Sequence, residues 1–307
     1  MTGAPGGRSG PAIEAADLKR AFERFQRDQM TQWAAALTYY SLLSLFPALL
    51  FGVAVLGFFG QSGLITDAAD YLKSAGAPPE TIDAVTSALA SAQEQRGTAL
   101  GALVIGLATA LYGASGAFGS AGAALNRVSR VEEGRGFVAH KLHNLVWTLT
   151  LVALVIVNCV LVFLGGDLAA DVLGLIGLGD TATAIWAIAR WPAALASAML
   201  VYAVVYYAAP NVEIRRWQYI TPGAVFGVAA WIAASAAFFV YVSELATYAA
   251  TYGAFATVVI LLIWLWLTNT VLLLGAELNA VVDVRRAPGL PQDYDGPVLP
   301  PKDPAEL

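Results

Sequence analysis

The chain has 307 residues, of which 58% are hydrophobic and only 13% are charged, whereas about 25% of the residues in an ordinary soluble domain are charged. A water-soluble protein of this composition would expose large apolar patches, so the composition excludes that class and indicates an integral membrane protein. The net charge of −5 says little about partners, because the charges are segregated along the chain. We therefore expect an all-α, polytopic membrane protein.

The N-terminal region precedes the first apolar run. Residues 1–13 are predicted to be disordered. Residues 14–33 are predicted to form an amphipathic helix at the membrane interface, because Leu18, Phe22 and Phe25 are spaced at i, i+4 and i+7 beside lysines and arginines. An ordinary solvated helix is the alternative. The region lacks the short apolar core of a signal peptide, so no cleavage is expected.

Six apolar runs approach or exceed the roughly 20 residues that a helix needs to cross a bilayer, and they define a membrane domain over residues 34–283. The predicted spans cover residues 34–59, 98–123, 145–164, 191–209, 222–241 and 255–274. The loop 60–97 carries two short apolar stripes and is predicted to form a helical hairpin on the outer face. The tail 287–307 is rich in proline and is predicted to be disordered.

The basic residues give the orientation of the spans. Fourteen of the seventeen lysines and arginines fall in the N-terminal segment, the C-terminal segment and the loops after the second and fourth spans. Because cytoplasmic loops are enriched in lysine and arginine, both termini are predicted to be cytoplasmic.

The first span contains the sequence LTYYSLLSLFP. Pro47 removes a backbone hydrogen bond near the middle of the span, so a kink is expected there. Thr38, Ser41 and Ser44 form a mildly polar strip before it. Their hydroxyls either bond the local backbone, which is common in membrane helices, or line a cavity.

The second span contains YGASGAFGSAGAALNR, in which glycine recurs at every third residue. Small residues allow close approach of backbones, so this helix is expected to pack centrally; a broken helix that lines a site is the alternative. Asn126 and Arg127 mark its inner end. Further along, Arg190 lies at the outer boundary of the fourth span, where it either snorkels or pairs with an acid, and Pro210 and Asn211 end that span on the inner side.

Glu277 follows the last span, in LLLGAELNAVVD. Its depth corresponds to the inner interface, at the level of Asn126, Arg127 and Asn279. We expect it to pair with Arg127 or Asn126, either as a structural clamp between the second and sixth spans or as a contact for a substrate or proton at the inner mouth.

Several kinds of chemistry have no motif in the sequence. There is no Walker A sequence, no hydrolase or metalloprotease signature, and no carboxylate cluster for two metal ions. His140 and His143 have no third ligand nearby, so no metal site is expected. The sequence therefore predicts no enzyme activity, no cofactor and no nucleic-acid partner.

The chain resembles the YihY/BrkB family of bacterial inner-membrane proteins. The resemblance rests on the segments AAALTYYSLLSLFPALL, ALNRV, YYAAPN, PGAVFGVAAWIAASAAFFVYV, YGAFATVVILLIWLWL and LLLGAELNAVVD, in the family's order over residues 30–283. It implies six helices in the bacterial inner membrane with cytoplasmic termini, and it marks as motif positions Tyr39, Ser44, Pro47, Asn126, Arg127, Pro210, Asn211, Gly275, Glu277 and Asn279. The family's ribonuclease label finds no support in this sequence, and some members are associated with moving lipids.

We expect a protein that transports or flips an amphipathic, lipid-like substrate, with membrane lipids as its surroundings. The alternative is a membrane scaffold or an envelope regulator that transports nothing. The sequence makes no prediction about substrate identity or oligomeric state.

Overall fold

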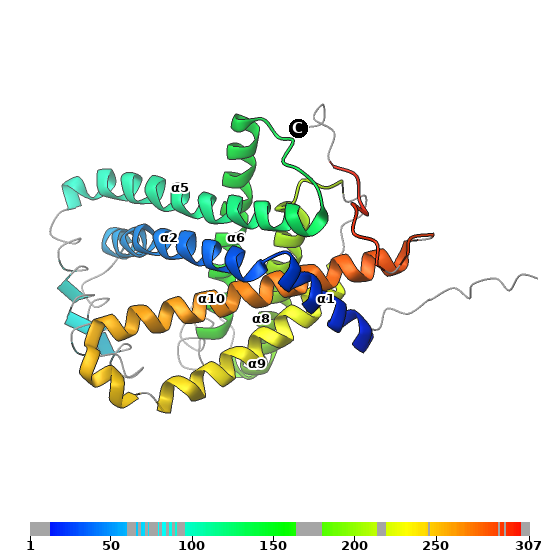
Figure 1. Cartoon of the computed structure of the whole chain (residues 1–307). Coiled ribbons are helices and arrows are strands. Elements are labelled where there is room, and N and C mark those ends of the chain that lie inside the picture. The colour runs from blue at the N-terminus through cyan, green and yellow to red at the C-terminus, as the bar shows by residue number, and fades with distance from the viewer. Residues whose placement is uncertain are drawn as a thin grey trace, which may run out of the picture. The chain divides into compact units, whose positions relative to one another are not determined.

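The computed structural model in Figure 1 describes most of the chain. The described residues are 13–59, 96–163, 180–213, 219–244, 246–287 and, apart from 292, 289–301, with scattered residues between 66 and 90. The hairpin expected over residues 60–97 lies largely outside the described residues, as do residues 1–12.

The described part of the chain is helical, as the composition predicts. Its helices are α1 (Ala15–Arg27), α2 (Met30–Phe59), α5 (Arg96–Ser129), α6 (Phe137–Phe163), α8 (Asp180–Ala208), α9 (Pro222–Glu244) and α10 (Ala246–Arg286). Its extended pairing is limited to an isolated antiparallel bridge between Val212 and Pro301.

Four helical segments among the described residues are long and apolar enough to cross a membrane. They are Phe137–Val162, Ala184–Ala208, Pro222–Val242 and Val258–Arg286. Each overlaps one of the last four predicted spans. The helices α2 and α5 cover the first two predicted spans, so the number of six spans stays a prediction.

The surface of α6 shows why a membrane is needed. Large apolar side chains such as Val146, Leu149 and Ile156 are exposed along it, and very few residues of this segment are buried inside the protein. In water, such a helix would expose a long apolar surface at a high free-energy cost. Its exposed side chains therefore fit contact with lipid.

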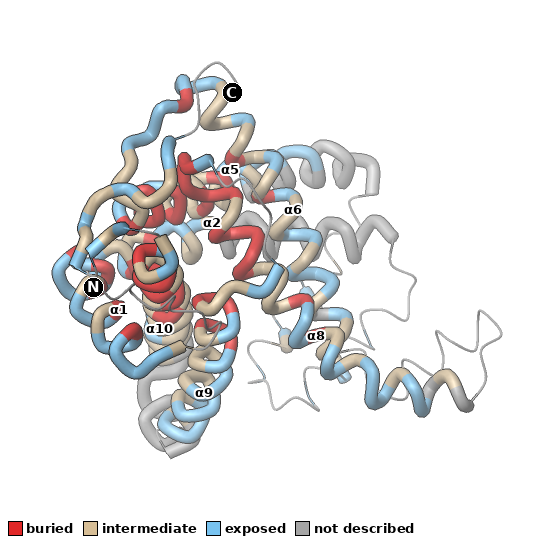
Figure 2. The backbone as a smooth tube through the Cα atoms, turned by 90° about the vertical axis from the view of Figure 1, so that its right-hand side faces the viewer, coloured by how far each residue is buried: buried red, intermediate tan, exposed pale blue. Residues whose placement is uncertain are grey.

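The chain divides into two compact units. The first contains residues 1–38 and 118–307, and the second contains residues 39–117. In the first unit, α10 packs against α9 and α1, while α8 packs against α6 and α9. Figure 2 shows buried stretches in red along α10, and Met30, Leu273 and Leu278 are among the fully buried side chains.

Glycines set the closest contacts in the first unit. A Cβ atom at Gly223 of α9 would collide with the carbonyl oxygen of Gly275 of α10, and one at Gly275 would collide with the hydroxyl of Tyr206. This hydroxyl donates a hydrogen bond of 2.7 Å to the carbonyl oxygen of Leu272. Small residues thus bring α9 and α10 into backbone contact, as is usual for helices in membranes.

The second unit pairs the remainder of α2 with the first two thirds of α5. A Cβ atom at Gly113 would lie 3.3 Å from the Cα atom of Ser44, and one at Gly116 would lie 3.5 Å from the ring of Tyr40. The helix α5 is continuous from Arg96 to Ser129. These contacts agree with the expected packing role of the glycine-rich span and not with a broken helix.

Candidate functional site

The buried carboxylate of Glu277 is paired with Arg24. Arg24 lies on α1, and its Nε donates a hydrogen bond of 3.1 Å to Oε2 of Glu277 on α10. The Glu277 side chain is 0% exposed and that of Arg24 is 11% exposed. Arg24 also donates from Nη2 to the carbonyl oxygen of Val128, at 3.1 Å. This cation therefore links α1, α10 and the end of α5.

The expected partners of Glu277 were wrong. Arg127 turns outward instead, with its Nε 3.9 Å from Oδ1 of Asp28, and its side chain is 59% exposed. Asn126 faces Asn211. The physical reason is that α1 packs on α10 and brings its own arginine over Glu277, so the charge of the N-terminal helix replaces that of the second span.

The backbone has an unusual conformation at two places, in the turn between α1 and α2 and at the end of α5. Gln29 and Arg130 have φ angles of 55° and 58°, in the left-handed region that side chains with a Cβ atom rarely adopt. At Arg130, the amide of Val131 donates a hydrogen bond of 3.0 Å to the carbonyl oxygen of Asn126. The amide of Arg130 donates one of 3.3 Å to the carbonyl oxygen of Arg127. These two bonds form a Schellman ending, in which glycine is the usual residue.

An arginine occupies that position because its side chain meets two carboxylates. The Nη2 atom of Arg130 lies 2.8 Å from Oδ2 of Asp28 and 2.7 Å from Oδ1 of Asp295. Burial works against the charged form of Arg130, but the hydrogen bonds to these two acids hold its pKa above its ordinary value. Burial would raise the pKa of Asp295, yet the hydrogen bond from Arg130 and the charges of three arginines hold it below its ordinary value.

The residues at the end of α8 are held by the end of α5 and the loop after it. The amide of Asn211 donates to Oδ1 of Asn126 at 2.6 Å, and Arg135 donates from Nη2 to the carbonyl oxygen of Ala209 at 3.2 Å. Asn126 in turn donates to Glu133 at 3.2 Å. Because the last carbonyls and the following amides of a helix lack partners within it, this network satisfies groups that would otherwise be stranded.

Glu133 is the charged centre of that network. Its carboxylate accepts hydrogen bonds of 2.6 and 2.7 Å from the buried guanidinium of Arg135, and His140 lies 3.4 Å away. Burial would raise the pKa of Glu133, but the hydrogen bonds from Arg135 hold it below its ordinary value. No group of three potential metal-binding side chains occurs among the described residues.

Asn279 satisfies backbone groups at the start of α9. Its Oδ1 accepts a hydrogen bond of 2.7 Å from the amide of Gly223, and its Nδ2 donates to Oγ1 of Thr221 at 3.1 Å. The first amides of a helix have no partner inside it, so Asn279 caps α9 from the neighbouring helix α10.

The other residues singled out in the sequence lie elsewhere. Pro210 is buried beside Asn211, and the guanidinium of Arg190 lies 4.9 Å from the ring centre of Trp191. In the second unit, Ser44 donates to the carbonyl oxygen of Ser41 at 2.8 Å, and Tyr39 is exposed.

The hydroxyls of the first span thus behave largely as local backbone partners. Thr38 likewise donates to Ala34 at 2.8 Å, and it accepts a hydrogen bond of 3.2 Å from Asn269 of α10. The helix α2 continues through Pro47, whose side chain is outside the described set.

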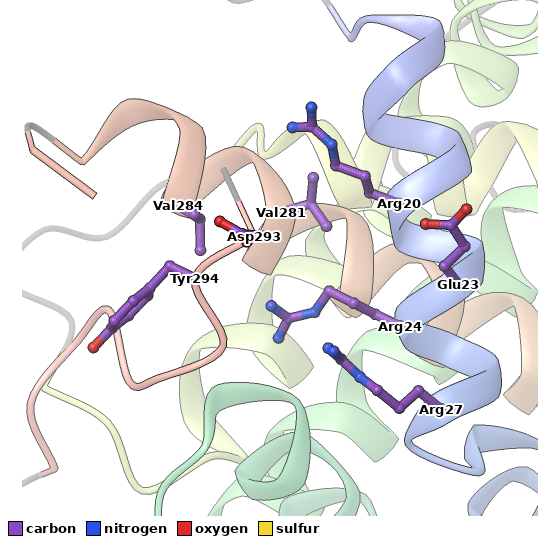
Figure 3. A pocket seen from close by; sticks show the side chains of 8 residues that line it. All are labelled: Arg20, Glu23, Arg24, Arg27, Val281, Val284, Asp293 and Tyr294. Atoms are coloured by element: carbon purple, nitrogen blue, oxygen red, sulfur yellow. The ribbon is translucent and has the colours of Figure 1, made fainter. Parts of the chain in front are cut away.

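A pocket of about 370 Å³ lies beside the Arg24–Glu277 pair, within the size range of small-ligand sites. Figure 3 shows three arginines of α1 pointing from that helix towards the tail, which follows α10. The lining residues are Arg20, Glu23, Arg24, Arg27, Val281, Val284, Asp293 and Tyr294. All of them belong to the first unit.

Reasoning from the sequence missed this pocket. The signal was present, because Arg20, Arg24 and Arg27 are spaced at i, i+4 and i+7 and must share one face of a helix. In the sequence, these arginines support only the orientation of the spans and the interfacial helix. The tail's contribution had no such signal, because its composition predicts disorder, whereas Asp295 contacts the arginines and the amide of Glu213 donates to Pro300 at 2.8 Å.

The comparisons with known proteins agree on the class of protein. A family model described as "Virulence factor BrkB" matches residues 21–296. A relative named "Putative ribonuclease-like protein YfkH", from Bacillus subtilis, is 30% identical over 88% of this chain and 96% of its own length. The relative named "UPF0761 membrane protein" from Alkalilimnicola ehrlichii is 29% identical over 83% of this chain, and the chain spans only 55% of that protein's length.

A further relative, "UPF0761 membrane protein PSHAa0171" of Pseudoalteromonas translucida, is 26% identical over 86% of this chain and 85% of its own length. No solved structure matches the chain. The apolar helices and these matches show a membrane protein. Since the family model covers most of its length, the chain belongs to the virulence factor BrkB family.

Proposed function

We propose that this protein lies in the bacterial inner membrane with both termini in the cytoplasm, and that it transports or flips an amphipathic, lipid-like substrate. The observation that carries the proposal is the arginine-lined pocket at the end of α10, one of the helices long enough to span the membrane. In this proposal the pocket is the entrance for the polar end of the substrate.

The two kinds of surface around the pocket suit a molecule with a charged head and apolar chains. Arg20, Arg24 and Arg27 give the pocket its basic side, while Val281 and Val284 give it an apolar side. On α1 itself, Leu18 and Phe22 are exposed. Such side chains at a helix surface can rest in the lipid interface while the arginines hold the head group.

The sequence has no Walker A motif, so in this proposal no ATP hydrolysis by the chain itself drives transport. The driving force is an ion gradient, a partner protein or the gradient of the substrate.

A scaffold or regulator that transports nothing is the second candidate, and a different observation favours it. Most of the inner-side polar side chains singled out in the sequence are engaged between helices: Asn126 with Asn211, Asn279 with Gly223, and Glu277 with Arg24. A protein whose polar groups are used to fix its helices needs no substrate to explain them.

Reconstitution separates the two candidates. The purified protein is placed in liposomes with a fluorescent phospholipid, and the lipid that crosses the bilayer is measured by quenching from outside. Transport requires protein-dependent crossing that falls in Arg27→Gln, which removes a charge that lines the pocket. Lys19→Gln removes the same charge from an exposed position on α1, where the side chain lies 3.8 Å from Glu23. Liposomes with this variant are expected to show lipid crossing at the normal rate. A folded protein that moves neither neutral nor anionic lipid would support the scaffold.

A further inference from the structure

One oxygen atom of the tail lies within a cage of arginines. Oδ1 of Asp295 accepts hydrogen bonds from Nη2 of Arg27 at 2.9 Å and from Nε and Nη2 of Arg130 at 2.9 and 2.7 Å. Nη1 of Arg24 lies 3.7 Å from the same oxygen. Several guanidinium groups that converge on one anionic oxygen form the arrangement by which proteins bind phosphate.

We propose that the arginine pocket binds a phosphate-bearing anion and that Asp295 occupies part of that anion's place, so that the anion and the tail compete for the same arginines. The proposal names the ligand chemistry for the pocket and rests on the proposed function for its biological role. The pocket takes the phosphate group either as a lipid head group or as free phosphate.

The charges around the pocket balance only when the tail is present. Without the tail, the pocket lining and the charged residues that contact Asp28 or Glu277 contain five arginines and three carboxylates, which leaves a net charge of +2. These residues are Arg20, Arg24, Arg27, Arg127, Arg130, Glu23, Asp28 and Glu277. Asp293 and Asp295 of the tail bring the net charge to zero. A phosphate monoester, with a charge of about −1.5 to −2 near neutral pH, would neutralise the cluster equally well.

The contacts of the tail permit an anion to replace the Asp295 carboxylate. The Asp295 side chain is 41% exposed and that of Arg27 is 53% exposed, and ion pairs on the water side of a protein are weak. On either side of Asp295 the chain is fixed, by the end of α10 at Arg286 and by the bridge between Val212 and Pro301. The segment between them can therefore release its carboxylate without the whole tail leaving the protein.

A phosphate group fits the pocket better than a second carboxylate. Its three oxygens can accept hydrogen bonds from guanidiniums that approach from different helices, here Arg27 from α1 and Arg130 from the end of α5. The pocket of about 370 Å³ shares Arg24 and Arg27 with the arginines around Asp295 and has Val281 and Val284 on its wall, which leaves room for the rest of a head group.

The test measures binding to the full chain in nanodiscs of neutral phosphatidylcholine. Calorimetric titrations use short-chain phosphatidic acid in one arm and inorganic phosphate in the other. Asp295→Asn is expected to tighten binding about fivefold, because the competing charge is removed. Glu213→Gln makes the same charge change at an exposed side chain outside the pocket lining and is expected to change binding less than about twofold.

The arginine side of the site has its own pair of variants. Arg27→Gln is expected to weaken binding about fivefold, and Lys19→Gln to leave it unchanged. Added ligand should also speed hydrogen exchange in the tail peptide over residues 289–301, because the tail loses its contacts. Melting temperatures of all variants check that they are folded.

Binding in either arm, with tightening by Asp295→Asn, supports the proposal, and the arm identifies the source of the phosphate. If phosphatidic acid and phosphate both fail to bind, or if Asp295→Asn binds no more tightly than Glu213→Gln, the proposal is overturned. Slower exchange of the tail in the presence of ligand would also refute competition. A protein that binds the anion but moves no lipid would contradict the proposed transport and leave this inference standing.

Discussion

Removal of Arg24 should cost more stability than removal of its partner Glu277. In Arg24→Met, the carboxylate of Glu277 stays fully buried and loses its hydrogen bond of 3.1 Å. In Glu277→Gln, the guanidinium of Arg24 keeps its bond to Val128, lies 3.7 Å from Asp295 and borders the pocket. The loss of Arg24 therefore leaves Glu277 without its cation, whereas the loss of the Glu277 charge leaves Arg24 with other partners.

The expected magnitudes follow from this asymmetry. Stranding a buried charge costs about 3–5 kcal/mol, so Arg24→Met should lower the free energy of unfolding by that amount. Glu277→Gln should cost about 1–3 kcal/mol, the range for an imperfectly paired polar group. The double variant should be more stable than Arg24→Met alone, because a buried amide costs less than a buried charge.

Thermal unfolding in detergent measures the difference. For a protein of this size, about 1 kcal/mol corresponds to roughly 2–4 °C, so Arg24→Met should melt roughly 10 °C below the natural protein. Arg27→Met is the matched control, since its side chain is half exposed and contacts Asp295 on the water side; it should change the melting temperature by about 3 °C at most. If Arg24→Met melts no lower than Arg27→Met, or if the double variant melts no higher than Arg24→Met, the clamp is refuted.

Three further predictions concern topology, the interface and packing. A reporter active only in the cytoplasm should be active when fused after residue 286 and silent within residues 166–180; the opposite pattern would reverse the orientation. Phe22→Glu, at an exposed position of α1, should increase proteolysis of that helix in membranes while the fold stays intact, and unchanged cleavage would place α1 away from lipid. Gly275→Ala should destabilise the protein by about 1–3 kcal/mol, because its Cβ atom would collide with neighbouring groups. Gly136→Ala, whose Cβ atom would meet nothing within 4 Å, is its control in thermal unfolding.

The helical class and the position of most helices could be predicted because they depend on local composition. Apolar length alone marks a span, and the last four predicted spans coincide with helices that qualify. The helix ends were less predictable: α10 continues to Arg286, twelve residues past the predicted end of its span at residue 274. That extension carries Glu277 and Asn279, so both lie inside a helix and face its neighbours.

The partners of the polar residues could not be predicted, because they depend on how the helices fold back on one another. The pairing of Glu277 with Arg127 was expected mainly from depth in the membrane, and depth cannot rank cations that lie at the same level. The spacing of Phe22 and Phe25 likewise suggested one apolar face. The structure divides it, since Phe25 is buried in the core while Phe22 is exposed. A single helix face therefore serves the protein interior on one edge and the surface on the other.

This division of α1 decides which variants can separate structure from function. Arg24 is committed to Glu277, so its loss would weaken the fold under either proposed function and would identify neither. Arg27 contacts the tail at an exposed site, so its loss should leave the fold nearly unchanged and alter what the pocket binds. If the protein is a scaffold without a ligand, Arg27→Gln should be silent in binding, in lipid crossing and in melting temperature alike. An effect on binding or crossing, without an effect on melting temperature, can arise only if the pocket has a ligand.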